Sequence, residues 1–188
     1  MLSAEKQLEI ISINTEEIIP EKELLIKLKD SVKNSIPLNV KLGFDPSRPD
    51  LHVGHSVVLN KLKSIQDLGH NIILVVGDFT AMIGDPTGQN KTRPQLSISE
   101  TKKNAETYIN QVSKILNINK TKIVYNSSWL NDISFSKIIE LCSKFTISQF
   151  LERDDFSKRY KNGKPISIHE FMYPLAQAYD SVFLRSDI

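Results

Sequence analysis

The sequence lacks the features that mark secreted and membrane proteins. Its single cysteine, Cys142, excludes an intramolecular disulfide and is typical of a reducing compartment. No apolar run is long enough to span a bilayer, and the opening residues MLSAEKQLEI carry glutamates where a signal peptide would be basic or apolar. These absences predict a cytoplasmic protein that does not engage a membrane.

Strong net charge and compositional bias are also lacking. The 24 lysines and arginines nearly balance the 22 acidic residues, and the resulting net charge of +2 is too mild to indicate a nucleic-acid binder by electrostatics alone. Hydrophobic residues make up 40% of the 188 residues, and no segment is of low complexity. We therefore expect a folded chain with one good core.

The order of the apolar patterns predicts the α/β fold class. The expected elements, in chain order, are helices over 3–13 and 20–34, a strand over 40–44, a helix over 53–68, a strand over 72–76, a helix from 97 to about 116, a strand over 122–125, helices over 134–145 and 167–177, and a strand over 181–184. Strand, helix and strand in succession form a βαβ unit, so the sheet should be parallel with flanking helices. Residues 1–37 form a helical preamble in this division, and residues 38–188 form the α/β unit.

Two histidines stand at the expected mouth of this βαβ unit. His52 and His55, in the stretch LHVGHS, come after the first strand and at the start of the following helix. Ligands of open α/β sheets bind beyond the carboxyl ends of the strands, and a helix N-terminus attracts anions. Imidazoles at this point can donate hydrogen bonds to phosphate, and Gly54 leaves room for a flat base against the backbone.

A metal site and a pair of solvated polar residues are the competing interpretations of the histidine pair. A zinc site would need third and fourth ligands, but His70, His169 and Cys142 show no paired spacing. The combination with a strand before and a helix after favours the anion site over a chance pair. The sequence therefore predicts no metal site.

The second strand leads into a glycine-rich loop over residues 77–88. This loop contains neither a P-loop nor a dinucleotide-binding G-x-G-x-x-G pattern. Asp85, which precedes Pro86, suits two roles equally, since an Asp-Pro pair starts turns and a carboxylate at a strand end can accept a ligand's ammonium group.

Four motifs, in this order and at these spacings, resemble bacterial tyrosyl-tRNA synthetases: GFDP at 43–46, LHVGH at 51–55, GDPTG at 84–88 and QAYD at 177–180. LHVGH is similar to the HIGH signature of class I aminoacyl-tRNA synthetases, with Val53 at the isoleucine position. An HxGH element also occurs in other nucleotidyltransferases, whereas QAYD separates the tyrosine enzyme from its tryptophan relative. The resemblance, which runs from about Val40 onward, implies a Rossmann-like sheet and the N-terminal part of a catalytic domain.

The resemblance also implies a role for each matching residue. His52 and His55 would contact the ATP phosphates and stabilise charge on the α-phosphorus. Gly54 would lie under the adenine, and Asp45 would line the floor between amino acid and ATP. The residues that would bind tyrosine are Asp85, Tyr173 and Gln177 at its ammonium group and Asp180 at its phenolic hydroxyl. Tyr173, Gln177 and Asp180 occur at i, i+4 and i+7, which places them on one face of a helix.

The implied reaction is the ATP-dependent activation of L-tyrosine to tyrosyl-adenylate, followed by transfer to tRNA(Tyr). Magnesium would arrive with ATP and would need no dedicated protein site. The implied assembly is a homodimer through residues 141–156, in which Phe145, Ile147 and Phe150 are buried against the partner. The tRNA would be bound mainly by segments outside these 188 residues.

Three departures from the family pattern stand out. Lys41 occupies a position where many bacterial members have a tyrosine over the substrate's phenol. The family's KMSKS loop and the G-G-x-D-Q segment that binds the ribose do not occur in these residues, so the chain alone is expected to be incomplete. The basic stretches at 89–96 and 157–164 are expected to be solvated loops.

Two further functional hypotheses stand beside the resemblance. One is a truncated, non-catalytic relative that binds tyrosine or a nucleotide, or only dimerises. The other is a non-synthetase HxGH nucleotidyltransferase, which would need neither QAYD nor the ammonium-binding residues.

Overall fold

The computed structural model describes residues 1–46, 50–84 and 98–188, with only the backbone for 98–103. Its elements, in chain order, are α1 (Ala4–Ser12), α2 (Glu21–Asn34), β1 (Asn39–Phe44), α3 (Val53–Asp67), β2 (Asn71–Val76), α4 (Thr80–Ile83), α5 (Ile98–Val112), the 3-10 helix η1 (Ile118–Lys120), β3 (Thr121–Tyr125), α6 (Ser127–Leu130), α7 (Phe135–Cys142), α8 (Ile147–Leu151), α9 (Asp154–Lys161) and α10 (Ile168–Leu184). Within the described ranges, no helix has the length and apolar character needed to cross a bilayer.

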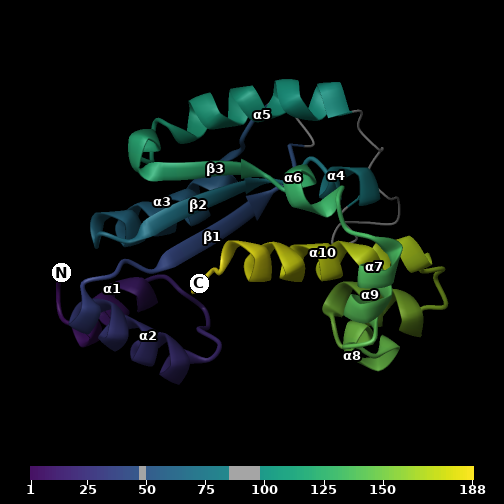
Figure 1. Cartoon of the computed structure of the whole chain (residues 1–188), viewed down its shortest axis with the longest axis horizontal. Helices are drawn as coiled ribbons and strands as arrows, with labels where there is room; N and C mark the ends of the chain where they lie inside the picture. The colour runs from purple at the N-terminus through teal and green to yellow at the C-terminus, as the bar shows by residue number, and fades with distance from the viewer. Residues whose placement is uncertain (47–49, 85–97) are drawn as a thin grey trace.

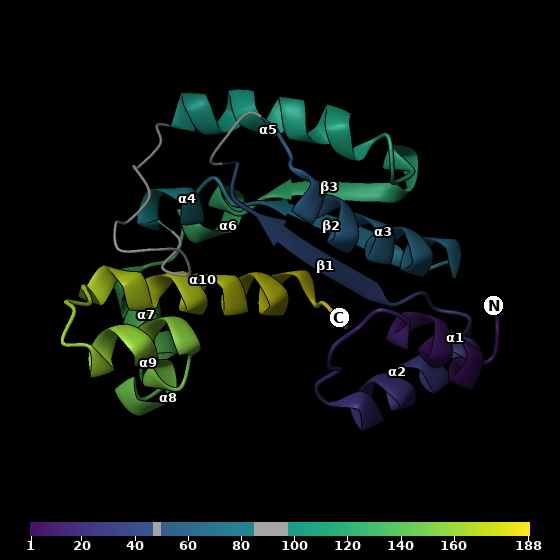
Figure 2. The same ribbon diagram turned by 180° about the vertical axis from the view of Figure 1, so that it is seen from behind.

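The three strands form a parallel sheet in the order β1-β2-β3 (Figure 1). The register pairs Leu42 with Leu74 and Leu74 with Ile123, so β2 is the central strand. Its residues from Ile72 to Val76 are all buried because helices cover both faces, as expected for a parallel strand. Figures 1 and 2 show α5 beyond β3, α10 below β1, and α3 across the face that Figure 2 turns toward the viewer.

Alternate residues of β2 divide the core into two clusters. Ile72 and Leu74 pack in a cluster with side chains from α1, α2, α3 and α5. Ile73 and Val75 face the other way, toward side chains from α6 and α10. The period-2 alternation of a strand therefore decides which helix meets which face.

The N-terminal helices share the larger of these clusters with the sheet. Ile11 of α1 and Leu28 of α2 are buried in it. Lys61 of α3 donates a hydrogen bond to the carbonyl of Ile11 at 2.8 Å, and Lys27 of α2 donates to the carbonyl of Asp187 at 2.7 Å. The division between residues 1–37 and 38–188 remains a prediction.

The structure confirms the strands expected over 40–44, 72–76 and 122–125 and the helices at 3–13, 20–34 and 53–68, within a residue or two at each end. Gly69 follows α3 with a φ of 98°, the left-handed conformation that ends a helix and favours glycine. The helix expected over 134–145 is shorter, and α8 and α9 follow it. The helix expected from 97 to about 116 ends at Val112, and its first expected residue, Ser97, lies outside the described residues.

The strand predicted over 181–184 is wrong, because these residues form the last turn of α10. Phe183 stacks on Trp129 with ring centroids 4.7 Å apart, and Ala176 packs against the same tryptophan. That seven-residue interval is a helical repeat, so tertiary packing overrides the β propensity of the short apolar run. The helix ends where Arg185 takes a φ of 49°.

A parallel-strand contact with β1 instead occurs at Ile188. Its N–H donates to the carbonyl of Asn39 at 3.2 Å, and its carbonyl accepts from the N–H of Lys41 at 2.8 Å. This is the pattern that one residue makes across a parallel pair of strands.

A capping box stands at the start of α10, where residues 167–170 fit the S-x-x-E pattern. The backbone N–H of Ser167 donates to Glu170 at 2.8 Å. Arg159 pairs with the buried Glu170 through both of its terminal nitrogens, and this bonding lowers the pKa of Glu170. The solvated loop expected over 157–164 is therefore wrong in part, because these residues are helical as far as Lys161 and Arg159 attaches α9 to α10.

His70 attaches α1 to the start of β1. Its Nδ1 accepts a hydrogen bond from the N–H of Leu38 at 3.1 Å, and its Nε2 lies 2.7 Å from Oε1 of Gln7. Gln7 donates through its amide nitrogen to the carbonyl of Leu2, so its oxygen is the atom that faces His70. These contacts need a neutral ring with its proton on Nε2. Burial lowers the pKa of His70, and the charge of Asp187 opposes this effect in part.

Acidification is therefore expected to weaken the fold through His70. Because its pKa is lower in the folded than in the unfolded chain, the unfolded chain takes up the proton first as the pH falls below about 6.5. The contribution of His70 to the free energy of unfolding is complete above that pH and is lost as the pH falls toward the folded-state pKa. Chemical unfolding at about pH 7.5 and about pH 5.5 gives the free energy of unfolding lost on acidification. This loss should be smaller in His70→Gln than in His169→Gln, a change at an exposed histidine. Equal losses in the two variants would exclude His70 as the cause.

Candidate functional site

The carboxyl ends of the three strands meet beside the middle of α10 (Figure 1). Asp45 follows β1, Gly77 follows β2, and Asn126 follows β3. These are the positions at which open α/β sheets bind ligands. Polar side chains from the strand ends and from α10 form one cluster here.

Asp180 is buried, with 4% of its surface exposed. Oδ1 accepts a hydrogen bond from the indole N–H of Trp129 at 2.9 Å, and Oδ2 accepts from the side-chain amide of Asn126 at 3.3 Å. Burial raises the pKa of Asp180, while these two donors and the charge of Lys41 oppose the rise. A carboxylate offers about four acceptor positions, so this group can accept a further donor.

Lys41 extends from β1 toward α10. Its ammonium group donates to the backbone carbonyl of Gln177 at 3.1 Å. Burial lowers the pKa of Lys41, and the charge of Asp180 opposes this effect. Opposite charges therefore interact across the space between β1 and α10.

Asp45 lies between α4 and α10. Its Oδ2 accepts a hydrogen bond from the Tyr173 hydroxyl at 2.7 Å, and its Oδ1 accepts from the Thr80 hydroxyl at 2.8 Å. The glycine at position 77 makes this arrangement possible, because an added Cβ there would lie 2.0 Å from Oδ1 of Asp45 and 2.4 Å from Oγ1 of Thr80. The loop after β2 must therefore lack a side chain at its first residue.

The two histidines of LHVGHS cap α3. His52 is the N-cap residue, and its Nδ1 accepts from the N–H of Gly54 at 3.1 Å. Nδ1 of His55 in turn accepts from the N–H of His52 at 3.2 Å, and the ring centroids are 4.0 Å apart. A neutral imidazole that accepts at Nδ1 carries its proton on Nε2, so both rings are in the tautomer that can donate to an anion through Nε2.

Gly54 serves this cap directly. A Cβ at this position would lie 2.9 Å from Cε1 and 3.0 Å from Nδ1 of His52. The ring of His55 also lies near that of Tyr108, with centroids 6.2 Å apart, and Tyr108 contacts Phe44 at the end of β1. Aromatic contacts thus connect the capped end of α3 to the strand end beside Asp45.

The structure brings some of the predicted site residues into contact, and others are not in contact or not described. Tyr173 contacts Asp45 directly, and Tyr173, Gln177 and Asp180 all lie on α10, as their spacing predicted. Gln177 is exposed, whereas Asp180 is buried. Asp85 lies outside the described residues. Among the side chains that the structure describes, no three of His, Cys, Asp or Glu gather closely enough to hold a metal ion.

Sequence reasoning missed Thr80, Asn126 and Trp129. Asn126 directly follows β3, so the strand-end rule that selected the other loops would also have selected it. Trp129 is the only tryptophan of the chain. Thr80 carries no signal in the sequence, because its role depends on contacts with residues from other elements.

The chain is similar to tRNA synthetases in sequence. Residues 33–188 match the family described as tRNA synthetases class I (W and Y). The tyrosine–tRNA ligase of Chlorobium luteolum is 59% identical over 186 residues, which are 99% of this chain and 46% of that protein. The tyrosine–tRNA ligase of Bdellovibrio bacteriovorus is 53% identical over 188 residues, 100% of this chain and 46% of that protein. The chain thus spans about half the length of the curated relatives it matches.

Solved structures share the fold. A C-terminally truncated mitochondrial tyrosyl-tRNA synthetase of Aspergillus nidulans superposes with a TM-score of 0.76 at 24% identity, over 98% of this chain and 54% of that one. The tyrosyl-tRNA synthetase of Archaeoglobus fulgidus, solved in complex with L-tyrosine, gives a TM-score of 0.71 at 18% identity, again over 98% and 54%. The Rossmann-like α/β fold and the resemblance based on the four motifs are confirmed.

Gly77→Ala should lower the free energy of unfolding more than Gly43→Ala does. The added Cβ would displace Asp45 or Thr80, and overpacking of this kind costs about 1–3 kcal/mol in the free energy of unfolding. Gly43→Ala is the matched control, since a Cβ at Gly43 would meet nothing within 4 Å. Chemical unfolding of both variants checks this prediction, and equal effects would contradict the close approach at Gly77.

Proposed function

The chain belongs to the class I tRNA synthetases of tryptophan and tyrosine, and we propose that it forms the N-terminal part of the catalytic domain of a tyrosine–tRNA ligase. In this reaction the carboxylate of tyrosine attacks the α-phosphorus of ATP, and the bond to pyrophosphate breaks. The tyrosyl-adenylate then passes its tyrosyl group to tRNA(Tyr). The names of relatives that are 53% to 59% identical support tyrosine as the amino acid.

The observation that carries the proposal is the buried carboxylate of Asp180. Its two described donors, Trp129 and Asn126, are neutral, and a phenolic hydroxyl suits the acceptor capacity that remains. Phenylalanine would fill the same space and offer no donor, which leaves a buried acceptor without its partner. Tyrosyl-tRNA synthetases are the standard example of this kind of discrimination.

The opposite end of the substrate would lie near Tyr173 and Gln177. Their spacing on α10 sets Gln177 about one turn and Tyr173 about two turns before Asp180, on the same side of the helix. We assign them, with Asp85, to the ammonium group of tyrosine. Asp45, held by Tyr173 and Thr80, would line the floor between tyrosine and ATP.

ATP would bind at the N-terminus of α3. The Nε2–H groups of His52 and His55 and the positive end of the helix dipole suit phosphate oxygens, and Gly54 would lie under the adenine. Magnesium would arrive as part of the ATP complex.

The reaction needs no nucleophilic side chain, because tyrosine supplies the nucleophile and the protein supplies position and donors for the developing phosphate charge. As an enzyme of translation, it would work in the cytoplasm, with tRNA held mainly by segments beyond these residues.

Asp180→Asn should erode the preference for tyrosine over phenylalanine. A hydrogen bond to a charged acceptor contributes about 1.5–3 kcal/mol, so tyrosine affinity should fall about 10-fold to 100-fold while phenylalanine affinity changes little. Calorimetric titration of the chain with each amino acid measures both affinities. Asp132→Asn, at an exposed acid, is the control and should leave the preference intact. An unchanged preference in Asp180→Asn would remove Asp180 from the phenol site.

The two histidines can be tested without loss of the helix cap. Asn at position 52 is a good N-cap, and Gln at position 55 preserves the capping box, yet neither carries the imidazole ring whose Nε2–H would reach the phosphate. His52→Asn and His55→Gln should slow formation of tyrosyl-adenylate by about 100-fold and leave tyrosine affinity nearly unchanged. Quenched-flow measurement of the adenylate and calorimetry of tyrosine binding separate the two effects. Equal losses in rate and affinity would contradict the phosphate role.

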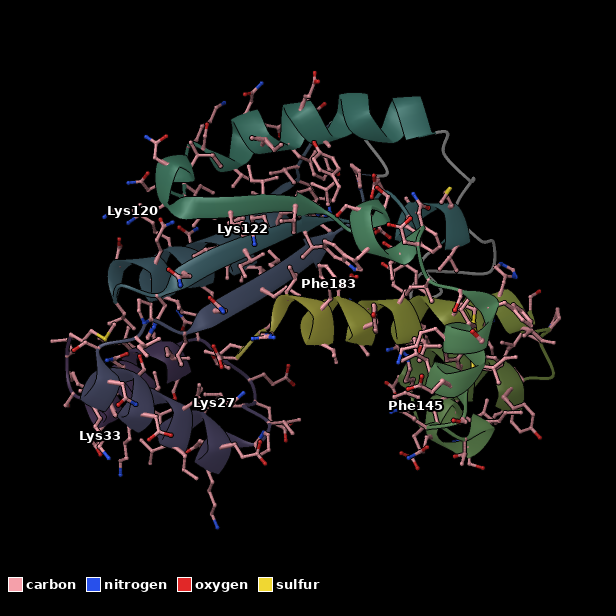
Figure 3. The ribbon with its side chains drawn as sticks, in the orientation of Figure 1. Lys27, Lys33, Lys120, Lys122, Phe145 and Phe183 are labelled. Carbon is pink, nitrogen blue, oxygen red and sulfur yellow. The ribbon has the colours of Figure 1, made fainter. Side chains whose placement is uncertain are left out.

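The homodimer is proposed for the helices that follow β3. Ile147 is 68% exposed and Phe145 is 42% exposed, and Phe145 packs on Phe150 with ring centroids 5.8 Å apart. Figure 3 shows Phe145 at the end of the molecule opposite to Lys27 of α2. Exposed apolar side chains within one segment suit a symmetric contact between two copies through residues 141–156.

Ile147→Asp should therefore shift the chain from dimer to monomer in sedimentation equilibrium. Ile26→Asp, on the distant α2 and 59% exposed, is the matched control and should leave the mass unchanged. A monomeric wild-type chain, or a dimer in Ile147→Asp, would contradict this interface.

A further inference from the structure

The hydrogen bonds that join Asp45 to Asp180 have fixed directions. Asp45 only accepts as a carboxylate, so the Thr80 hydroxyl donates to it, at 2.8 Å. The lone pairs of that hydroxyl then accept from the amide nitrogen of Asn126, at 3.2 Å. The second hydrogen of the same nitrogen reaches Asp180 at 3.3 Å. Asn126 cannot be turned around, because its oxygen accepts from the N–H of Phe79 at 3.0 Å.

The series therefore runs without a break between two acids that the proposed function gives to different parts of the substrates. Thr80 is 4% exposed, Asn126 is 1% exposed and Asp180 is 4% exposed. Hydrogen bonds in such a dry interior polarise one another, so a change at one member affects its neighbours. Thr80 is the member that contacts Asp45 directly, and Asn126 is its connection to Asp180.

The amide of Asn126 is shared between two acceptors at nearly equal distances. A new donor at Asp180 would weaken the hydrogen bond that this carboxylate accepts from Asn126. Asn126 would then donate more strongly to Thr80, and the polarised hydroxyl would donate more strongly to Asp45. The same coupling must act in the reverse direction, since coupling free energies between sites are reciprocal.

We propose that Thr80 is a positioning residue, whose hydroxyl couples the Asp180 carboxylate to the Asp45 carboxylate. This inference rests on the proposed function, in which a phenol bound at Asp180 would change how Asp45 is held between tyrosine and ATP. Recognition of the correct side chain is thereby transmitted toward the reacting groups. Thr80 itself touches neither substrate in this account.

The chain contains its own reporter for this coupling. Trp129 is the only tryptophan, and its indole N–H donates directly to Asp180. The chemical shift of that N–H in a nitrogen–proton NMR spectrum therefore reports on the Asp180 carboxylate without any ligand. A substitution at Asp45 should move this resonance only as far as the series of hydrogen bonds transmits the change.

The test is a double-mutant cycle read at the Trp129 indole. Asp45→Asn should shift the resonance in the wild-type background and should shift it at least about fivefold less in the Thr80→Val background, where the hydroxyl is gone. Thr80→Ser keeps the hydroxyl and should restore the full shift. Thr121→Val is the matched control, because Thr121 also donates one hydrogen bond and accepts another, but in contact with Asn117 and Gln66. It should leave the shift caused by Asp45→Asn intact.

An equally large shift in the Thr80→Val background would overturn the proposal, as would failure of Thr80→Ser to restore it. Tyrosine affinity supplies the second measurement, and it should fall about 10-fold in Thr80→Val and recover to within about twofold in Thr80→Ser. The cycle at Trp129 uses no ligand, so it separates the two proposals. A wild-type chain that shows the coupling and binds no tyrosine would overturn the proposed function alone.

Discussion

The burial of the Asp180 carboxylate constrains the site at the ends of the strands. A charge removed from water is costly unless hydrogen bonds and opposite charge surround it. Here Trp129 and Asn126 donate to the carboxylate, and the charge of Lys41 opposes the rise in its pKa that burial causes. Each of these partners comes from a different element, so α6, β1 and the residue after β3 must all be correctly placed before Asp180 can be buried.

The parallel sheet is what allows so many elements to converge. All three strands end at one edge, so the residues that follow them become neighbours although they are far apart in sequence. α10 passes beside this edge and contributes Tyr173 at one end of the cluster and Asp180 at the other. Packing of Ile73 and Val75 against side chains of α6 and α10 fixes how far these two helices lie from β2. Site and core therefore depend on the same strand.

The long elements and the motifs were predictable from the sequence, because each has a local signal. The helix caps at Ser167 and Gly69 and the buried run of β2 needed no tertiary information. The short helices α4 and α6 offered no periodicity to detect, being only four residues long. The run 181–184 was misassigned because its apolar residues match a strand until Trp129 is known to pack against them.

The candidate site was predictable in part for the same reason. Asp45, Tyr173 and Asp180 were selected by motif and spacing, and the structure adds the contacts that hold them. Thr80 and Trp129 could not be selected, since nothing next to them in sequence shows that they meet an acid. The requirement for glycine at position 77 was hidden likewise, because the atoms that exclude a side chain there belong to Asp45 and Thr80.

The most direct test of this account is a crystal structure of the chain grown with L-tyrosine. The account predicts the phenolic oxygen at about 2.5–3.0 Å from a carboxylate oxygen of Asp180, with the ammonium group beside Tyr173 and Gln177. A tyrosine bound with its phenol away from Asp180, or with its two ends reversed along α10, would contradict the central claim that this buried acid recognises the substrate.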